Sequence, residues 1–463
     1  MENRTNDFFI TEPIKQLILK FAIPSITALL VSSLYNIVDQ IFIGQGIGYL
    51  GNAATNVVYP ITVIAMSITL LIGDGCAAFL SICQGSKDYK NSEKSVGNAL
   101  ALILLSSLII VFILFLAKDR ILWFFGATPQ NIKYSIEYFN YILIGIPFFM
   151  LGSGLPPIIR CDGNPKFAML ATLSGCILNI ILDPLMIFVF NLGIKGAAIA
   201  TVIGQVISGL LCVYYLFHAK SFKLKSNDLL LSTKILKKCL PLGISSFLTQ
   251  ISIMINLTVM NNTIVRYGNL SKYGADIPLS VAGIVQKIFG IIISIVVGLA
   301  AGSQPIIGYN YGAKKYDRVK ELYKSILIAE MITGIIATII LECFPMQVIH
   351  IFGSESALYN EYAIMAFRIF FSTTTLCCIL KGTSIFMQAL GKPIMSMGLA
   401  LLRDFVLCVP LILILPIKLG IIGPLLSGPI SDIISFIAVI GVMFYLKKLL
   451  STDKKSPNKF GHS

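Results

Sequence analysis

Charged residues are scarce in this chain. Asp, Glu, Lys and Arg together make up 13% of its 463 residues, whereas a soluble domain carries about 25%. Hydrophobic residues make up 56%, and the mean hydropathy is +0.85. So few charges cannot cover a water-facing surface, which excludes a soluble globular protein and predicts an integral membrane protein.

The residue patterns of common catalytic sites are also missing. The three histidines (His218, His350 and His462) fall in predicted loops or near the C-terminus, and none of the ten cysteines forms a Cys-x-x-Cys pair. The sequence therefore lacks the ligand spacing of a zinc site, and it has no Walker motif for ATP. We expect neither an enzyme nor a resident cofactor, and we expect the cysteines to pack helices as small apolar residues.

Long apolar stretches, by contrast, recur along the whole chain. A helix needs about 20 apolar residues to cross a bilayer of about 30 Å. Such stretches lie near 15–44, 52–83, 95–117, 134–159, 167–190, 196–217, 236–265, 278–304, 322–341, 358–389, 394–416 and 420–446. The predicted fold class is an all-α integral membrane protein with twelve transmembrane helices.

Sequence echoes between the halves indicate a duplication. Residues 84–90, Gln-Gly-Ser-Lys-Asp-Tyr-Lys, return at 311–317 as Tyr-Gly-Ala-Lys-Lys-Tyr-Asp, and Ile23-Pro24 returns as Leu240-Pro241. Duplicated halves place a substrate site between two lobes in many secondary transporters. We predict two pseudo-symmetric six-helix lobes, which divide the chain into an N-lobe at 1–217, a cytoplasmic lobe linker at 218–235, a C-lobe at 236–446 and a basic cytoplasmic tail at 447–463.

Basic residues predict the orientation. With both termini inside, 25 Lys and Arg residues fall on the cytoplasmic side and seven on the outer side, and such a bias sets topology. We therefore expect a multi-pass protein of a bacterial plasma membrane with both termini in the cytoplasm. Its formal net charge of +14 then belongs to a rim that faces anionic membrane lipids. A nucleic-acid partner would need a basic soluble domain, and none is expected.

Ionisable residues inside the spans are costly and therefore mark candidate functional sites. The first half holds three acids (Asp39, Asp74 and Asp183) without a Lys or Arg at comparable depth. The second half holds a mixed set that can neutralise itself in pairs: Lys287, Arg368, Lys381, Arg403, Glu330, Asp404 and Asp432. The acids of the first half must instead hold a proton, hold a metal cation or meet a cationic substrate.

Polar residues of the first half are expected to converge at one depth. Helical spacing puts Asn179 on the same face as Asp183 and Asn36 on the same face as Asp39, with Thr201 in the same layer. Oxygens of this kind suit Na⁺ bound by Asp39 and Asp183, and they suit a shared proton equally well. The alternative is that the two acids only pin helices through hydrogen bonds.

Other residues are candidates for a substrate cavity. Asp74 lies near mid-membrane between two glycines. It could line the cavity, or it could serve only in helix packing. Aromatic and methionine side chains such as Phe148, Met150, Met254 and Phe289 offer a soft, adaptable wall. Pro24 shares a helix with Asp39, so a bend there could couple the ionic state of Asp39 to cavity shape, although ordinary kinking is the alternative.

Several motifs resemble those of the MATE (multidrug and toxic compound extrusion) family. The first-helix motif of that family is similar to residues 34–44, its fifth-helix motif to Asn179-Ile180-Ile181-Leu182-Asp183-Pro184, and its signature at the end of helix eight to residues 302–313. Residues 160–165 resemble the family's motif in the loop after helix four. The pair Gln286-Lys287 resembles the corresponding pair in the MepA-like bacterial branch. The likeness covers residues 10–446.

The resemblance implies a transporter rather than an enzyme. It implies export of amphipathic, often cationic drugs or dyes in exchange for H⁺ or Na⁺, with the cation at Asp39, Asn179, Asp183 and Thr201. Gln286 and Lys287 then belong to the substrate cavity. We expect a functional monomer, with small-molecule substrates and membrane lipids as its partners and no cofactor other than the transported H⁺ or Na⁺.

Two rival functions stay open. A flippase for lipid-linked precursors would need a cationic cavity for phosphates, which Lys287, Arg368 and Arg403 could supply. An intramembrane enzyme could use Asp39 and Asp183 as an aspartyl pair, but the sequence has no hydrolase motif and such an enzyme leaves the duplication unexplained.

Overall fold

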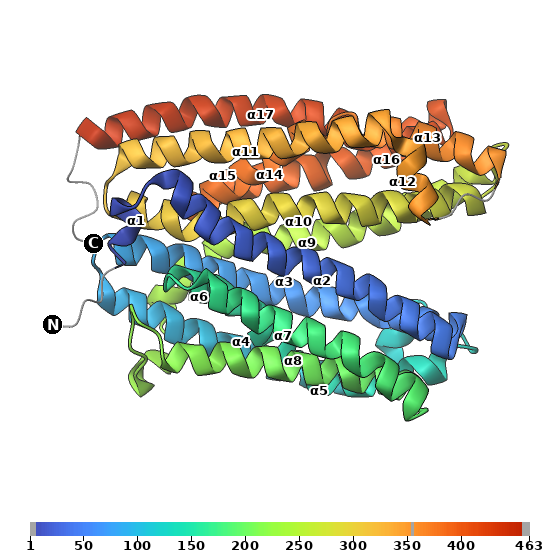
Figure 1. The fold of residues 1–463 in the computed structure, drawn as a ribbon, viewed down its shortest axis with the longest axis horizontal. Coiled ribbons are helices and arrows are strands. Elements are labelled where there is room, and N and C mark those ends of the chain that lie inside the picture. The colour runs from blue at the N-terminus through green and yellow to red at the C-terminus, as the bar shows by residue number, and fades with distance from the viewer. Residues whose placement is uncertain (1–5, 353–355, 456–463) are drawn as a thin grey trace. The chain divides into compact units, whose positions relative to one another are not determined.

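The computed structural model describes residues 6–352 and 356–455, and every regular element among them is helical (Figure 1). The first half contains α1 (Phe8–Thr11), α2 (Ile14–Ile47), α3 (Tyr49–Gly85), α4 (Tyr89–Phe124), α5 (Ile132–Gly154), α6 (Pro156–Cys161), α7 (Pro165–Pro184), η1 (Leu185–Val189) and α8 (Ile194–Phe217). The second half contains η2 (Ser226–Leu229), α9 (Thr233–Gly268), α10 (Asp276–Gly312), α11 (Tyr316–Cys343), α12 (Pro345–Phe352), α13 (Ala357–Phe371), α14 (Thr374–Ala389), α15 (Pro393–Leu401), η3 (Leu402–Leu407), α16 (Cys408–Leu419) and α17 (Ile422–Lys455).

The number of membrane-length helices agrees with the predicted fold class. Within the described residues, eleven helices are long and apolar enough to cross a membrane, and a twelfth span results if α13 and α14 count as one. These two helices meet at an angle of 43°. The break falls at Ser372 and Thr373, and the Thr373 hydroxyl donates a hydrogen bond to Asp432 at 2.8 Å.

Matching backbone conformations support the duplication. Lys87 and Lys314 occupy equivalent positions of the repeated segments at 84–90 and 311–317, and both have a left-handed backbone, with φ of 63° and 58°. Gly193 and Gly420 are related by the same sequence offset. Both have φ of 57°, and they lie just before α8 and α17. A non-glycine residue rarely adopts positive φ, at a cost of about 1 kcal/mol. The same local conformation has therefore been kept at equivalent points of the two halves.

The chain forms two compact units. Unit 1 comprises Met1–Phe247 and Ala301–Ala313, and unit 2 comprises Leu248–Ala300 and Lys314–Ser463. These bounds differ from the predicted lobes, because the linker, the start of α9 and the end of α10 all belong to unit 1. The basic tail predicted at 447–463 continues α17 as far as Lys455, and residues 456–463 lie outside the described part of the chain.

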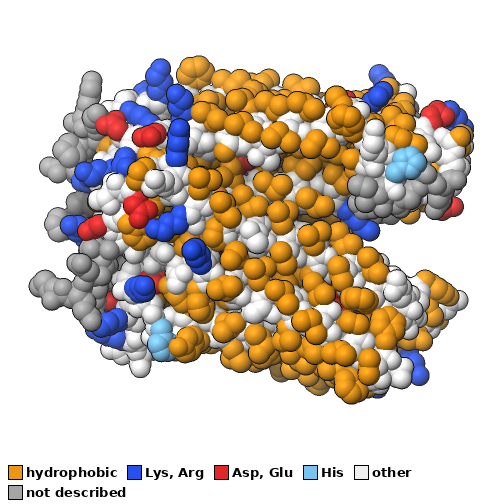
Figure 2. Space-filling model, viewed as in Figure 1, with side chains coloured by type: hydrophobic (Ala, Val, Ile, Leu, Met, Phe, Trp, Pro, Cys, Tyr) orange, Lys and Arg blue, Asp and Glu red, His pale blue; other side chains and the backbone are white. Residues whose placement is uncertain are grey.

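Unit 1 is built around apolar faces of α3, α4, α5 and α8, which bury side chains such as Ile61, Leu100 and Phe139. The opposite faces are apolar too. Phe112 and Leu116 on α4 expose 64% and 68% of their surface. Figure 2 shows hydrophobic side chains over the middle of the helices, whereas Lys and Arg gather near helix ends. Large apolar residues that point outward are stable only against lipid, as a membrane protein requires.

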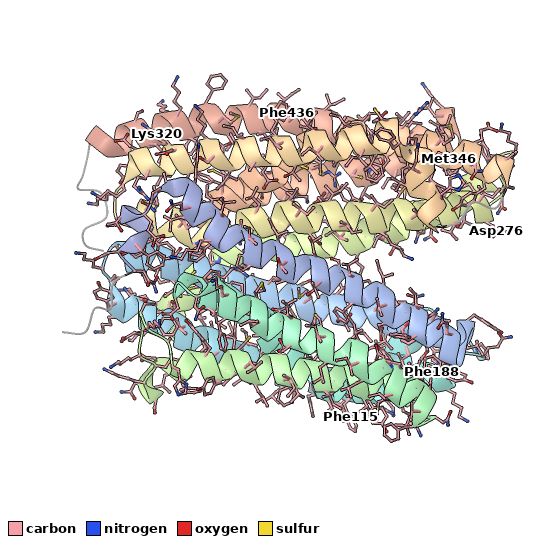
Figure 3. The ribbon with its side chains drawn as sticks, in the orientation of Figure 1. Phe115, Phe188, Asp276, Lys320, Met346 and Phe436 are labelled. Carbon is pink, nitrogen blue, oxygen red and sulfur yellow. The ribbon has the colours of Figure 1, made fainter. Side chains whose placement is uncertain are left out.

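Unit 2 has its own core, with aromatic residues of α13 at its centre: Tyr362, Phe367 and Phe371 have no exposed surface. Asp276 at the start of α10 and Lys320 on α11 lie at opposite ends of this unit (Figure 3). The predicted spans at 278–304 and 322–341 likewise place residues 276 and 320 on opposite sides of the membrane.

Glycines bring the end of α10 against α3. A Cβ atom on Gly85 would lie 2.0 Å from the Tyr309 carbonyl oxygen, and one on Gly312 would lie 2.1 Å from that of Ile82. No other residue allows so close a backbone approach. The signature segment at 302–313 therefore forms part of the packing of unit 1.

The segment predicted as the lobe linker is fixed to unit 1. Asp162 accepts hydrogen bonds from the Ser221 backbone N–H at 2.7 Å and from Tyr215 Oη at 2.6 Å. Phe222 is 1% exposed and lies in the core of unit 1. The buried Asn98 donates to the carbonyls of Asp228 and Leu230, each at 3.1 Å, and accepts from the Ser232 N–H at 2.7 Å.

These three hydrogen bonds predict that Asn98→Ala lowers the free energy of unfolding by about 2–4 kcal/mol, because one buried and two partly buried hydrogen bonds to the backbone are lost. The apparent melting temperature of the purified protein should fall, and trypsin should cut faster at Lys223 and Lys225, which are exposed. Asn227→Ala, at an exposed residue of the same segment, is the matched control. Equal proteolysis of both variants and the wild type would contradict the anchoring role.

Candidate cation site and intramembrane charges

The α7 helix presents the first two candidate residues on one face. Asn164 caps its start by accepting a hydrogen bond from the Phe167 N–H at 3.1 Å. Asn179 and Asp183 follow near its end at a spacing of four residues, and the Asn179 amide donates to Asp183 at 3.2 Å. Pro184 has no N–H, so α7 cannot continue its hydrogen bonding. The chain enters the π-helix η1 at that point, a form that often marks functional sites.

The α2 helix brings Asp39 to the same place. Asp39 is 7% exposed and Asp183 has no exposed surface. The two carboxyl groups lie close enough to interact directly with each other. Two carboxylates at this range repel when both are ionised, so the arrangement needs a shared proton or a bound cation.

Three buried oxygens of this site receive no hydrogen bond from any described residue: Asp39 Oδ1, Asp183 Oδ2 and Asn179 Oδ1. No described Lys, Arg or His forms an ion pair with either acid. Buried acceptors without a donor are unstable. The site therefore offers what a proton or a hard cation needs, which is negative charge and free oxygen ligands.

A second layer of polar side chains surrounds the acids. The Asn179 amide also donates to Thr201 on α8 at 3.3 Å, and Tyr138 on α5 interacts with Thr201 and with both acids. Tyr35 on α2 interacts electrostatically with both acids. Neither tyrosine is among the residues predicted from the sequence. Tyr35 was recognisable, since it lies four residues before Asp39 and so on the same helix face, but no sequence pattern connects Tyr138 to the site.

Asn36 does not join this site. It is exposed, and its amide donates to the Ser32 carbonyl one turn back on its own helix at 2.6 Å. The three-residue spacing to Asp39 rotates Asn36 by about 60° around the helix axis, which is enough to turn it away. Gln40 lies beside Asp39 instead and donates to Thr55 on α3 at 3.1 Å.

The half-buried Asp74 connects helices within unit 1. Its carboxylate accepts a hydrogen bond from the Ser246 hydroxyl on α9 at 2.7 Å. A Cβ atom on Gly73 would lie 2.4 Å from the Gly154 carbonyl, so the flanking glycine allows a close helix contact. Arg160 interacts electrostatically with Asp74. The expectation that the first half lacks a compensating cation is therefore wrong for Asp74, because Arg160 belongs to the fourth span rather than to a loop.

In unit 2 four of the predicted intramembrane charges neutralise one another. Lys381 pairs with Asp404 at 2.5 Å, Asp404 pairs with Arg403 at 2.8 Å, and Arg403 pairs with Asp432 at 2.9 Å. All four side chains are buried. We call these residues the charge tetrad. Its two positive and two negative charges cancel, so it offers no net charge to an ion or a substrate.

Three of the predicted intramembrane charges of unit 2 lie outside the tetrad. Lys287 and Arg368 are exposed and form no ion pair with a described residue. Glu330 has no exposed surface, and neither carboxyl oxygen has a hydrogen-bond partner among the described residues. The predicted pairing is therefore incomplete, because Glu330 faces Gly382 on α14 rather than a cation.

The predicted cavity residues divide by exposure. Phe148, Met254 and Gln286 are partly exposed. Met150 has no exposed surface and packs in the core of unit 1, so it cannot line a cavity here. Phe289 packs edge-on against Phe370 and lies under the Arg403 guanidinium at 5.6 Å.

Pro24 is buried within α2, which continues through it. A Cβ atom on Gly302 of α10 would lie 2.8 Å from the Phe21 carbonyl and 3.0 Å from Ser25 Oγ. The α10 backbone therefore contacts α2 on both sides of Pro24. Whether Pro24 acts as a hinge stays a prediction.

Sequence comparison identifies the family. A model of the MatE family matches residues 24–185 and 246–414. This chain belongs to the MatE family. The resemblance found in the motifs is thereby confirmed, and the MatE membership together with eleven or twelve membrane-length helices makes the chain a multi-pass membrane protein.

Among relatives of this MatE chain is the multidrug export protein MepA of Staphylococcus saprophyticus, which is 25% identical over 443 residues and 94% of each chain. MepA of Staphylococcus aureus strain N315 is 25% identical over 456 residues, which cover 96% of this chain and 97% of that protein.

Solved structures share the fold. A crystal structure of MATE in complex with MaL6 superposes with a TM-score of 0.88 at 24% identity, over 97% of this chain and 99% of that one. A multidrug resistance MATE family transporter of the MOP superfamily, described as outward-facing, gives 0.87 at 24% identity over 97% and 98%.

The charge tetrad leads to a stability prediction. Lys381→Met should destabilise the protein by about 3–5 kcal/mol, because it leaves an uncompensated buried carboxylate. Lys381→Met combined with Asp404→Leu should be less destabilising than Lys381→Met alone, since Arg403 and Asp432 remain as a neutral pair. Thermal unfolding in detergent measures both, with Lys287→Met as the control at an exposed lysine. A double variant as unstable as the sum of its single variants would refute the tetrad as one unit.

Proposed function

We propose that this chain is a cation-coupled multidrug exporter of a bacterial plasma membrane. It moves amphipathic, often cationic compounds outward in exchange for inward H⁺ or Na⁺, with both termini in the cytoplasm. Family membership and the MepA relatives support export of drugs. The observation that carries the coupling is the set of three buried oxygens at Asp39, Asn179 and Asp183 that lack a donor among the described residues.

The acid pair gives the coupling its physical basis. With no cation bound, Asp39 and Asp183 repel each other in a site of low dielectric. A proton between them, or Na⁺ held also by Asn179 and Thr201, removes that repulsion and draws α2, α7 and α8 together. A cation drives transport only if it binds one conformation more tightly than the other. The acid pair meets that condition if the helices that carry it separate in one of the two states.

The precursor-flippase alternative is less well supported. It needs net positive charge for phosphates, and two of the second half's basic residues, Lys381 and Arg403, are neutralised by Asp404 and Asp432. The other two intramembrane candidates, Lys287 and Arg368, remain. An aspartyl protease would need a water molecule between its two acids and access for a peptide, whereas Asp39 and Asp183 are both buried.

We expect Asp183→Asn to reduce cation-driven export by about tenfold or more, because coupling free energies of about 1–3 kcal/mol correspond to changes of about 5–150-fold. Export of a cationic dye by the purified protein in proteoliposomes measures this. Asn36→Ala is the matched control. It removes a polar side chain of the same layer that bonds only its own helix, and it should export at the wild-type rate.

The same vesicles identify the coupling ion. A pH gradient and a Na⁺ gradient are imposed separately, and the gradient that drives wild-type export should fail to drive Asp183→Asn. Thermal unfolding shows that the variant is folded. Wild-type export by folded Asp183→Asn would eliminate the acid pair as the coupling site. If neither gradient drives dye export by the wild type, flipping of polyprenyl phosphates becomes the function to test.

A further inference from the structure

We propose that an anionic phospholipid of the inner leaflet binds in a groove on the cytoplasmic part of α9. Its phosphate lies at Thr233 and Lys237, and one acyl chain lies along Leu236, Leu240 and Ile244. The groove belongs to unit 1 and is separate from the acid pair, so the inference stands independently of the transport mechanism.

The groove is a shallow, open hollow along one face of α9. It has a volume of about 380 Å³ and is lined by six residues: Thr233, Leu236, Lys237, Leu240, Pro241 and Ile244. These residues recur at intervals of three and four, which places them on one face of α9. The opposite face carries Ile235, Cys239 and Leu242, which are 3%, 0% and 5% exposed and attach α9 to unit 1. One face of α9 is therefore packed against unit 1, and the face with the groove stays accessible.

The length of the groove fits one leaflet. Thr233 and Ile244 are separated by about 16 Å along the helix axis at about 1.5 Å per residue. Half of a hydrocarbon core of about 30 Å is about 15 Å. One acyl chain of a lipid whose headgroup is level with Thr233 therefore extends over the whole apolar wall.

The polar and apolar residues of the groove are separated along the axis of α9. Both of its polar side chains, Thr233 and Lys237, are at the cytoplasmic end, and the rest of the wall is apolar. A lysine ammonium and a hydroxyl are ordinary phosphate ligands. Pro241 lacks an N–H, so the carbonyl of Lys237 loses its helical donor. A headgroup with hydroxyls, such as that of phosphatidylglycerol, can donate to this carbonyl.

The surroundings favour a lipid as the occupant. Leu229, Leu230 and Leu231 precede α9 and are 38%, 70% and 43% exposed. They cannot turn into the core, because Asn98 holds the backbone on both sides of Leu229. Exposed leucines beside exposed lysines are the pattern of a segment that lies at a membrane surface.

The adjacent lysine provides an internal comparison. Lys238 lies 6.0 Å from the Phe79 ring of α3, on the side of α9 that faces unit 1. Lys237 and Lys238 thus carry the same charge at neighbouring positions, but only Lys237 lines the groove. A site that depends on Lys237 alone can be told apart from general attraction between lipid and a basic helix end.

The position of the groove gives lipid binding a structural consequence. The α9 helix passes from unit 1 to unit 2 at Phe247 and Leu248, one turn after Ile244. A bound lipid adds contacts to the part of α9 that belongs to unit 1. We therefore expect anionic lipid to raise the thermal stability of the whole protein.

The test uses the full-length protein in a neutral detergent, with phosphatidylglycerol or phosphatidylcholine of the same acyl chains added. Native mass spectrometry counts bound lipid, and thermal unfolding measures the gain in melting temperature. We expect phosphatidylglycerol to bind and stabilise. Lys237→Gln should weaken binding by about tenfold through loss of a charge-assisted contact. Leu236→Trp, which fills the groove, should also weaken binding.

Matched controls decide the outcome. Lys238→Gln removes the same charge, and Ile437→Trp adds the same ring at a residue of α17 that is 67% exposed; both should bind lipid like the wild type. Equal loss in Lys238→Gln, equal binding of phosphatidylcholine, or equal stabilisation by inorganic phosphate would each overturn the proposal. Lys237→Gln changes an exposed side chain, so it keeps the test valid even if Leu236→Trp does not fold.

Discussion

The cost of placing charge in a membrane is the constraint on which this structure depends. An ion leaves water only if other charges or polar groups replace its hydration. Unit 2 meets the constraint internally, since Lys381, Arg403, Asp404 and Asp432 cancel one another through contacts of 2.5–2.9 Å. Unit 1 leaves the pair of Asp39 and Asp183 without any such partner among the described residues. That difference separates a unit with a neutral cluster of buried charges from a unit with an uncompensated acid pair, which is the pair proposed to bind the coupling cation.

The duplication makes this difference interpretable. Pro24 corresponds to Pro241, and the same sequence offset relates Asp39 to Asn256. The acid of one half is thus an amide in the other, and Asn256 donates to the Asp404 carbonyl at 2.6 Å. An amide needs no counter-charge, although the buried Oδ1 of Asn256 receives no hydrogen bond from any described residue. The two copies have kept the backbone conformations at Lys87 and Lys314 while their buried polar residues have changed. Shared turns with altered polar residues are consistent with one scaffold that serves two electrostatic purposes.

The sequence predicts much of this molecule because a membrane limits the possible structures. Twelve spans follow from hydropathy, since only helices and closed barrels satisfy the backbone in lipid. The convergence of Asn179, Asp183 and Thr201 follows from helical spacing and depth. Side-chain direction is harder to predict. Asn36 turns away and Met150 is buried, because small rotations about the axis decide which neighbours a residue meets. The sequence places Arg160 in a loop, because the predicted span ends at residue 159, whereas α6 continues to Cys161. The anchoring of the linker by Asn98 and Asp162 depends on contacts between distant parts of the chain, which no local pattern encodes.

Glu330 provides a comparison for the acid pair. It is as buried as Asp183, and it also lacks a hydrogen-bond donor among the described residues. A single acid in apolar surroundings can remain neutral by keeping one proton, and it then needs no partner. Two acids side by side are different, because a single shared proton still leaves one negative charge. That residual charge must be met by a second proton, by a metal cation or by a change in helix packing. Burial alone therefore does not make an acid a coupling site. Under the proposed function, it is the proximity of Asp39 to Asp183 that makes this pair the coupling site, because it links the number of bound cations to the arrangement of α2 and α7.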